Sequence, residues 1–325
     1  MFINLHAHIM WDLIFLAAGF ILLIFGANYL VDNASALASK LRISNLVIGL
    51  TIIAFGTSSP ELVVSVISSV QGNSEIAIGN IVGSNIFNIM AILGISALIL
   101  PLSVKSTTTW IEIPLCLLSA LLIFTLAHTG TANKTGYLMI SRTDGYILLI
   151  MFLAFALYNY HLSKKGDISE DINVRQKSTR RSVLMIIAGL AMLVGGGRLV
   201  VISSVNIAIE IGVSERLIGL TIVATGTSLP ELVTSVVAAI KGNTDIAIGN
   251  IVGSNIFNVF LILGISAVIN PVPLVQGTST DILVNIFASF LLFAFIFTGK
   301  QRQIERWEGL VFIIAYLLYI ALILF

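Results

Sequence analysis

Charged residues are scarce in this sequence. Asp, Glu, Lys and Arg make up only 10% of the 325 residues, whereas hydrophobic residues make up 57%, and the mean hydropathy is +1.04. Soluble globular domains carry about 25% charged residues, so this composition excludes that class. Apolar runs of about 20 residues recur, and each is long enough to cross a bilayer as a helix. The sequence therefore predicts an all-α membrane protein.

Thiol and imidazole groups are almost absent as well. Cys116 is the only cysteine and lies in an apolar run, which excludes a disulfide framework. The N-terminal stretch contains His6 and His8, but a metal site needs about three or four ligands. The same stretch lacks the basic region of a signal peptide, so none is expected. We predict no cofactor and no metal site built from sulfur or imidazole.

Hydropathy and helix-breaking residues divide the chain into ten predicted transmembrane helices. Their limits are 10–31, 44–70, 74–100, 109–127, 145–162, 182–205, 214–240, 244–270, 281–298 and 306–325. The one strongly polar segment, 163–181, is too short to bury a core and is predicted to be a linker. It separates residues 1–162 from residues 182–325, and each part holds five spans.

An internal repeat relates these two parts. When the chain is shifted by 170 residues, Gly49–Pro101 falls on Gly219–Pro271 without a gap, and 37 of the 53 positions are identical. Because five is an odd number of spans, the second part enters the membrane upside down relative to the first. The sequence therefore predicts two inverted five-helix repeats, which is the plan of many secondary transporters.

Positive charges gather on one side of the predicted membrane. The loops after spans one, three, five, seven and nine carry 13 Lys and Arg residues, against three on the opposite side. Since Lys and Arg accumulate in cytoplasmic loops, the linker 163–181 is predicted to be cytoplasmic and both termini to lie outside. The expected location is the plasma membrane, which is the inner membrane in a Gram-negative cell.

Two nearly identical polar stretches interrupt apolar spans. They read GTSSPELV at Gly56–Val63 and GTSLPELV at Gly226–Val233. An acidic side chain at mid-membrane costs about 2.5–3.5 kcal/mol, so Glu61 and Glu231 are expected to face a partner or an ion pathway. The preceding prolines break a helix, and broken backbone at membrane depth is tolerated only where it is buried or lines a cavity. Helices 2 and 7 are therefore predicted to be broken here.

Other oxygen-bearing side chains accompany both glutamates. They are Thr57, Ser58, Ser84 and Asn88 in the first repeat, and Thr227, Ser228, Ser254 and Asn258 in the second. Thr57 precedes Glu61 by four residues and therefore shares its helix face. Hard cations such as Ca²⁺ and Na⁺ prefer oxygen ligands, and Ca²⁺ takes about six to eight of them. A pseudo-two-fold axis in the membrane plane would bring both sets together at the centre.

A simpler interpretation exists for a single copy of this pattern. A kinked helix with a protonated carboxylic acid in a packed core would explain one stretch, and Gly79, Gly83, Ser84 and Asn85 would serve helix packing. Two copies in inverted repeats, each with a glutamate in mid-span, favour an ion site instead.

At these residues the chain resembles the cation/Ca²⁺ exchanger superfamily, and prokaryotic sodium/calcium exchangers in particular. The two repeated blocks are similar to that family's alpha repeats, and the ten-span layout covers essentially the whole chain. The resemblance implies that the broken helices 2 and 7, together with helices 3 and 8, form the ion site. It also implies that helices 1 and 6 slide across this core to alternate access.

The resemblance also implies which atoms bind the ions. The matching positions are the side chains of Thr57, Ser58, Glu61, Ser84, Asn88, Thr227, Ser228, Glu231, Ser254 and Asn258, and the backbone carbonyls of Ala54 and Ala224. Some members, including potassium-dependent ones, have Asp where this chain has Asn258, which argues against potassium dependence here. The short linker also lacks the large Ca²⁺-sensing domains of animal exchangers.

The predicted function is antiport of Na⁺ and Ca²⁺ by a secondary transporter, not an enzyme. Two ionised glutamates neutralise one Ca²⁺, whereas the family's usual load of three Na⁺ leaves a positive surplus. Exchange is therefore expected to be electrogenic. The expected direction of exchange is export of Ca²⁺. A proton/Ca²⁺ antiporter remains open, although the hydroxyls of the two GTS stretches fit Na⁺ better. The expected partners are Ca²⁺, Na⁺ and the lipid bilayer, with no nucleic acid and no obligate protein partner.

Other classes fit the sequence less well. An ATP-driven pump needs a P-loop or a phosphorylated Asp, and the NKTG stretch at 133–136 begins with Asn133 instead. An intramembrane enzyme would need a nucleophile or a His cluster beside the glutamates, and inverted repeats with broken helices favour alternating access over a channel. Among the remaining polar residues, Asn28 and Asp32 are expected to be capping or interface groups, and Arg198 to snorkel or pair.

Overall fold

The fold is given by a computed structural model, which describes residues 2–129, 138–164, 178–211, 224–274, 277–299 and 302–324. Part of the predicted span 214–240, most of the predicted linker 163–181 and the NKTG stretch lie outside these residues. Eight of the described helices are long and apolar enough to cross a membrane, and one bent pair makes a ninth candidate. The prediction of a multi-pass helical protein is confirmed at this level. The count of ten spans stays a prediction.

The elements follow the internal repeat. Those of the first repeat are α1 (Phe2–Leu41), α2 (Asn45–Ile48), η1 (Gly49–Ile53), α3 (Ala54–Thr57), α4 (Ser59–Val70), α5 (Ser74–Ile86), η2 (Phe87–Leu93), α6 (Gly94–Ile99), β1 (Leu102–Ser103), η3 (Thr108–Glu112), α7 (Ile113–Thr129), β2 (Met139–Ile140) and α8 (Arg142–Lys164). Those of the second are α9 (Thr179–Glu210), α11 (Ala224–Gly226), α12 (Leu229–Ile240), α13 (Thr244–Phe257), η5 (Asn258–Leu263), α14 (Gly264–Ile269), β3 (Val272–Pro273), α15 (Thr278–Phe295), β4 (Gln303–Ile304) and α16 (Arg306–Leu324). The η segments are π-helical turns, which occur mostly within longer helices and frequently at functional sites.

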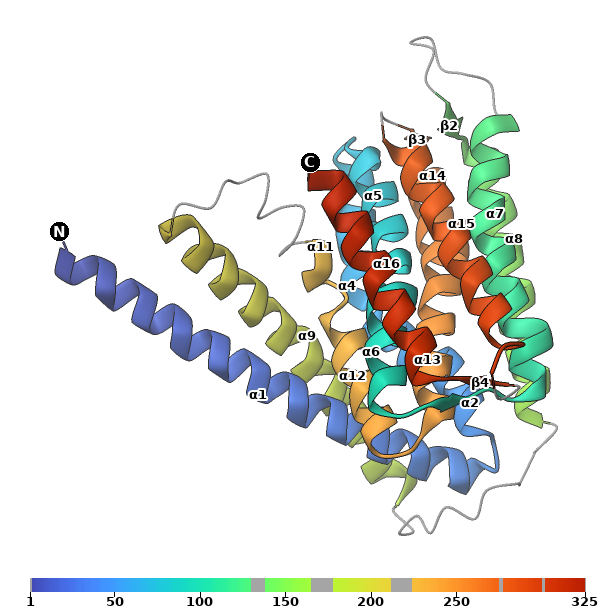
Figure 1. Ribbon diagram of the computed structural model, residues 1–325, viewed down its shortest axis with the longest axis horizontal. Helices are drawn as coiled ribbons and strands as arrows, with labels where there is room; N and C mark the ends of the chain where they lie inside the picture. The colour runs from blue at the N-terminus through green and yellow to red at the C-terminus, as the bar shows by residue number, and fades with distance from the viewer. Residues whose placement is uncertain are drawn as a thin grey trace.

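Two long helices, α1 and α9, lie side by side and lean away from the other helices (Figure 1). A Cβ added at Gly196 would lie 2.8 Å from the carbonyl oxygen of Gly19, and one added at Gly26 would lie 2.8 Å from that of Gly189. Only glycine permits backbones to approach this closely, and such packing is what holds helices together in lipid. Gly19 and Gly189, like Gly26 and Gly196, are 170 residues apart, so the contact follows the repeat.

The two repeated blocks form the centre of the bundle. The helix that runs through α5, η2 and α6 and the one that runs through α13, η5 and α14 are the most completely buried candidate spans. α4 packs against α5, and α12 packs against α13 in the same way. A helix that is apolar nearly all round belongs where protein surrounds it.

The outer helices cross between the repeats. α16 of the second repeat packs against α6 of the first, and α8 of the first packs against α14 of the second. Two short antiparallel sheets do the same, because β1 pairs with β4 and β2 pairs with β3. The sequence does not predict these strands, since two residues are too few to show an alternating pattern. The repeats therefore form one interlocked unit.

Two of the predicted helix ends are wrong. The first span is predicted to end at residue 31 and the sixth at residue 205, but α1 continues to Leu41 and α9 to Glu210. The polar residues that end the apolar run of α1 find protein partners: Asn33 donates to the carbonyl of Tyr29, and Asp32 pairs with Lys241. Because these groups are satisfied, the helix continues past them.

The predicted break in the second span is confirmed. The helical segments Asn45–Thr57 and Ser59–Val70 meet at an angle of 48°. Pro60 lies in the first turn of α4, where the N–H that proline lacks would have no partner within the helix. In the second repeat Thr227 and Ser228 form the turn between α11 and α12. The breaks correspond after a shift of 170 residues.

Candidate cation-binding site

The two intramembrane glutamates lie just after these breaks. Glu61 is in the first turn of α4 and Glu231 is in the first turn of α12. The unpaired N–H groups and the dipole of a helix N-terminus favour negative charge at this position. Each residue is only 1% exposed. The fold therefore buries two carboxylates at two helix N-termini.

Each carboxylate is held by a serine of the opposite repeat. The Ser58 hydroxyl donates to Glu231 Oε1 over 2.9 Å, and the Ser228 hydroxyl donates to Glu61 Oε1 over 2.9 Å. The helices of the repeated blocks add one further serine each. Ser254 donates to Glu231 Oε1 over 3.5 Å, and the Ser84 hydroxyl oxygen lies 3.1 Å from that of Ser228. These crossed contacts bring the two glutamates into one site.

Two asparagines that the sequence analysis did not predict as site residues connect the helix breaks to the central helices by hydrogen bonds. Thr57 donates to Asn250 Oδ1 over 3.0 Å, and Thr227 donates to Asn80 Oδ1 over 3.4 Å. Through their Nδ2 atoms the same asparagines bond the backbone carbonyl of the glutamate in their own repeat. The available signal was their matched place in the blocks EIAIGNIVGSNIFN and DIAIGNIVGSNIFN. We infer that they position the threonines.

A second set of amides lies roughly one to two turns beyond Asn80 and Asn250 along the central helices. Asn88 Nδ2 donates to Asn255 Oδ1, and Asn258 Nδ2 donates to Asn85 Oδ1, each over 2.9 Å. These bonds use the nitrogen of each donor amide. These bonds fix the orientation of the Asn88 and Asn258 side chains, and they leave the amide oxygen of each side chain available as an acceptor or ligand.

Four buried oxygens of the site have no hydrogen-bond donor among the described residues. They are Glu61 Oε2, Glu231 Oε2, Asn88 Oδ1 and Asn258 Oδ1. A buried acceptor without a partner is costly, and an ion coordinated by oxygen would remove that cost. The donor set consists of carboxylates, amides and hydroxyls, which suits Ca²⁺ and Na⁺ rather than metals that prefer sulfur or nitrogen. The residues present therefore fit a hard cation.

Comparisons with known proteins identify the family. The family model for the sodium/calcium exchanger protein matches residues 11–161 and 181–325. The chain belongs to the sodium/calcium exchanger family. Sodium/calcium exchanger MaX1 of Methanosarcina acetivorans is 33% identical over 349 residues, which cover 97% of this chain and 99% of that protein. Inner membrane protein YrbG of Escherichia coli is 32% identical over 318 residues, covering 95% of each chain.

The fold of this exchanger family member is also similar to a solved structure. The sodium-calcium exchanger NCX_Mj, soaked with 10 mM Na⁺ and zero Ca²⁺, superposes with a TM-score of 0.80. The two chains are 32% identical, and the match covers 96% of this chain and 99% of the other. Membership of this family indicates cation/Ca²⁺ exchange by a membrane transporter rather than enzyme catalysis.

The structure places the predicted ligands of this exchanger around the two helix breaks. Ten are buried, namely Ala54, Thr57, Ser58, Glu61, Ser84, Asn88, Ser228, Glu231, Ser254 and Asn258. Thr227 is half-buried, and the Ala54 carbonyl oxygen lies 3.3 Å from the Thr57 hydroxyl oxygen. Ala224 is the first residue of α11. That these atoms bind an ion stays a prediction.

A cavity of about 400 Å³ lies beside the site in this exchanger. α4 contributes Pro60 and Val64 to its wall, α9 contributes Arg198 and Val201, and the break of the second repeat contributes Thr227. The cavity separates the middle of α9 from α4. At the matching place after the shift of 170 residues, α1 packs along α12. The two sides of the site therefore differ in how closely the long helix is packed.

Proposed function

We propose that this chain is a secondary antiporter that exchanges Na⁺ for Ca²⁺ by alternating access. The observation that carries the proposal is the crossed arrangement in which Ser58 bonds Glu231 and Ser228 bonds Glu61, while one oxygen of each carboxylate has no donor within the described part of the chain. The proposed ligands are the twelve residues predicted from the sequence. Asn80 and Asn250 position two of them.

The charge of the site supports an electrogenic exchange. Two ionised carboxylates match the charge of one Ca²⁺ and cannot neutralise three Na⁺, so the two loads differ by about one net charge. The same two carboxylates would serve both ions, which makes simultaneous binding unfavourable. Ca²⁺ and Na⁺ are then expected to compete, as coupled exchange requires.

The proposed architecture supplies a route to each side of the membrane. Ten helices in two inverted repeats, 1–162 and 182–325, would place the site on a pseudo-two-fold axis near the bilayer midplane. The distribution of Lys and Arg supports a cytoplasmic linker at 163–181, external termini and a plasma-membrane location. With an inward Na⁺ gradient, this arrangement would export Ca²⁺. The family resemblance assigns the sliding motion to α1 and α9.

A proton/Ca²⁺ antiporter is the alternative, because protons could replace Na⁺ on the two glutamates. The purified protein should be reconstituted into Ca²⁺-loaded vesicles and given either an imposed Na⁺ gradient or an imposed pH gradient. Ca²⁺ flux that follows the Na⁺ gradient in both directions supports the proposal. Ca²⁺ flux that follows only the pH gradient would show that the coupling ion is a proton and not Na⁺. Ca²⁺ flux without coupling to either ion would indicate a channel.

A further inference from the structure

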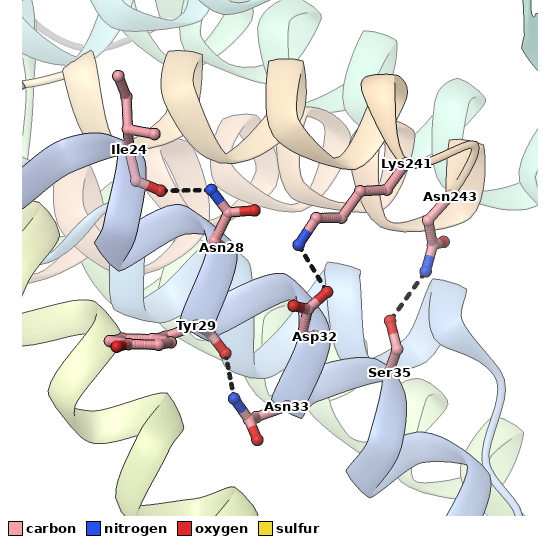
Figure 2. Close-up of polar contacts among 8 residues, drawn as sticks. All are labelled: Ile24, Asn28, Tyr29, Asp32, Asn33, Ser35, Lys241 and Asn243. Carbon is pink, nitrogen blue, oxygen red and sulfur yellow. Dashed lines mark hydrogen bonds and ion pairs between the residues drawn. The ribbon is translucent and has the colours of Figure 1, made fainter. Parts of the chain in front are cut away.

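Three polar residues of α1 lie on the face that contacts the second repeat. Asn28, Asp32 and Ser35 are spaced four and three residues apart, so they follow one side of the helix. Figure 2 shows this side facing the end of α12 and the start of α13. Lys241 Nζ lies 2.6 Å from Asp32 Oδ1, and Asn243 Nδ2 donates to Ser35 Oγ over 3.0 Å. Asn28 instead donates to the carbonyl of Ile24 within its own helix.

The partners of α1 belong to a tightly defined turn. Lys241 is the C-cap residue of α12, where the helix dipole favours a positive charge. Gly242 follows with φ of +74°, a conformation that favours glycine and ends the helix. Asn243 then caps α13 by accepting a bond of 3.2 Å from the Ile246 N–H. The turn therefore holds Lys241 and Asn243 in place against α1.

Within the described ranges, the first repeat offers α9 no equivalent of the ion pair between Asp32 and Lys241. After the shift of 170 residues, Asp32 corresponds to Ile202, Ser35 to Val205, and Lys241 to Gln71. An amide and an aliphatic side chain cannot form an ion pair. Ile202 instead lines the cavity that separates α9 from α4. The two long helices, α1 and α9, are thus related by the repeat, but they differ in the polar contacts that attach them to the neighbouring helices.

We propose that Asp32 and Lys241 are positioning residues that hold the end of α1 near the linker against the turn between α12 and α13, and so close the site on that side. We call this pair, together with Ser35 and Asn243, the α1 latch. The inference rests on the proposed function, in which α1 must move for the site to open on that side. Because only one repeat carries this pair, the latch favours the state in which the site is closed on the linker side over the state in which it is open there.

The strength of the latch suits a contact that opens in every cycle. The side chains of Lys241 and Asp32 are 28% and 51% exposed, so solvent screens their attraction. Such a pair is expected to change an equilibrium by about two- to fivefold. A fully buried pair would be far harder to open once per turnover.

Two variants break the latch and a third rebuilds it. Asp32→Asn removes the carboxylate, Lys241→Gln introduces the residue found at the matching position of the first repeat, and Asp32→Lys with Lys241→Asp reverses the pair. Lys105→Gln is the control, because Lys105 forms an ion pair of 2.6 Å with Asp245 at a place that does not involve α1. The three residues that these variants change, Asp32, Lys241 and Lys105, have partly exposed side chains, and monodisperse elution would verify folding.

The position of α1 is measured in the full chain without transport. Spin labels at Ser39→Cys on α1 and Thr107→Cys near η3, in a Cys116→Ala background, report the distance by double electron–electron resonance. Each latch-breaking variant should raise the displaced fraction of α1 by about two- to fivefold, and the reversed pair should restore the original distribution. Lys105→Gln should leave it unchanged. Unaltered distances in both breaking variants, or failure of the reversed pair to restore them, would overturn the latch.

A second readout separates positioning from general damage. In vesicles of defined orientation, the apparent Ca²⁺ affinity is measured from the linker side and from the opposite side. In the variants that break the latch, the ratio of these two affinities should shift in favour of the linker side by about two- to fivefold relative to the unmodified chain. If α1 moves as expected while the unmodified protein exchanges no Na⁺ for Ca²⁺, only the proposed function fails. If exchange is normal and α1 does not respond, only the latch fails.

Discussion

The Ser58 hydroxyl donates a hydrogen bond of 2.9 Å to Oε1 of Glu231, a residue of the opposite repeat. The matching bond joins Ser228 to Glu61 over the same distance. Each helix break therefore supplies a donor that fixes the carboxylate of the other. Ion coordination by either glutamate then depends on residues from both halves of the chain.

Removal of the Ser58 hydroxyl should weaken ion binding. Ser58→Ala leaves Glu231 Oε1 with one fewer donor, and bonds to a charged group contribute about 1.5–3 kcal/mol, so apparent Na⁺ and Ca²⁺ affinities should fall at least about tenfold. Titration of Ca²⁺ uptake against each ion measures the change. Ser59→Ala is the matched control, because the Ser59 hydroxyl donates only to the Phe55 carbonyl of its own helix. Equal effects of both substitutions would contradict the assigned role of Ser58.

Neutralisation of either glutamate should abolish Ca²⁺ transport. Glu61→Gln or Glu231→Gln keeps the side-chain shape but leaves one negative charge for a divalent ion, and loss of one buried charged partner costs about 2–5 kcal/mol. Ca²⁺ uptake should fall roughly 100-fold or more at subsaturating Ca²⁺. Glu75→Gln is the control, because Glu75 is exposed in the first turn of α5 and outside the site. Robust uptake by either site variant would refute the assignment.

A methyl group at the contact of α1 and α9 should destabilise the protein. Gly196→Ala would place a Cβ 2.8 Å from the Gly19 carbonyl oxygen and push the helices apart, at a cost of about 1–3 kcal/mol. The midpoint of thermal unfolding in detergent should therefore fall. At Gly195 an added Cβ meets no heavy atom within 4 Å, so Gly195→Ala should leave the midpoint unchanged or raise it slightly. A reversed order of the two variants would argue against the packed helix pair.

Exchange should respond to the membrane potential. If one net positive charge crosses in each cycle, 100 mV contributes about 2.3 kcal/mol and shifts the equilibrium Ca²⁺ gradient by roughly 40-fold. Vesicles clamped with potassium and valinomycin at several potentials measure this shift at a fixed Na⁺ gradient. A Ca²⁺ gradient that stays constant across potentials would show electroneutral exchange, and the proposed loads of one Ca²⁺ and three Na⁺ would then be wrong.

Much of the architecture could be predicted because its causes are local or repeated. Hydropathy reports burial in lipid directly, so most of the described spans lie close to their predicted limits. The repeat places Glu61 and Glu231 at equivalent positions, and proline in each stretch marks the breaks. The first span was predicted to end too early because Asp32 lowers the local hydropathy. In the structure the helix continues past Asp32, since its carboxylate pairs with Lys241.

The sequence by itself determined that this chain has buried helices with two repeated acidic breaks, since apolar runs and intramembrane charge carry that information at each position. Only the tertiary structure decided that Ser58 serves Glu231 rather than Glu61, and that Asn250 orients Thr57. Those contacts join residues more than 170 positions apart. They follow from how the interlocked repeats pack, which no local pattern encodes.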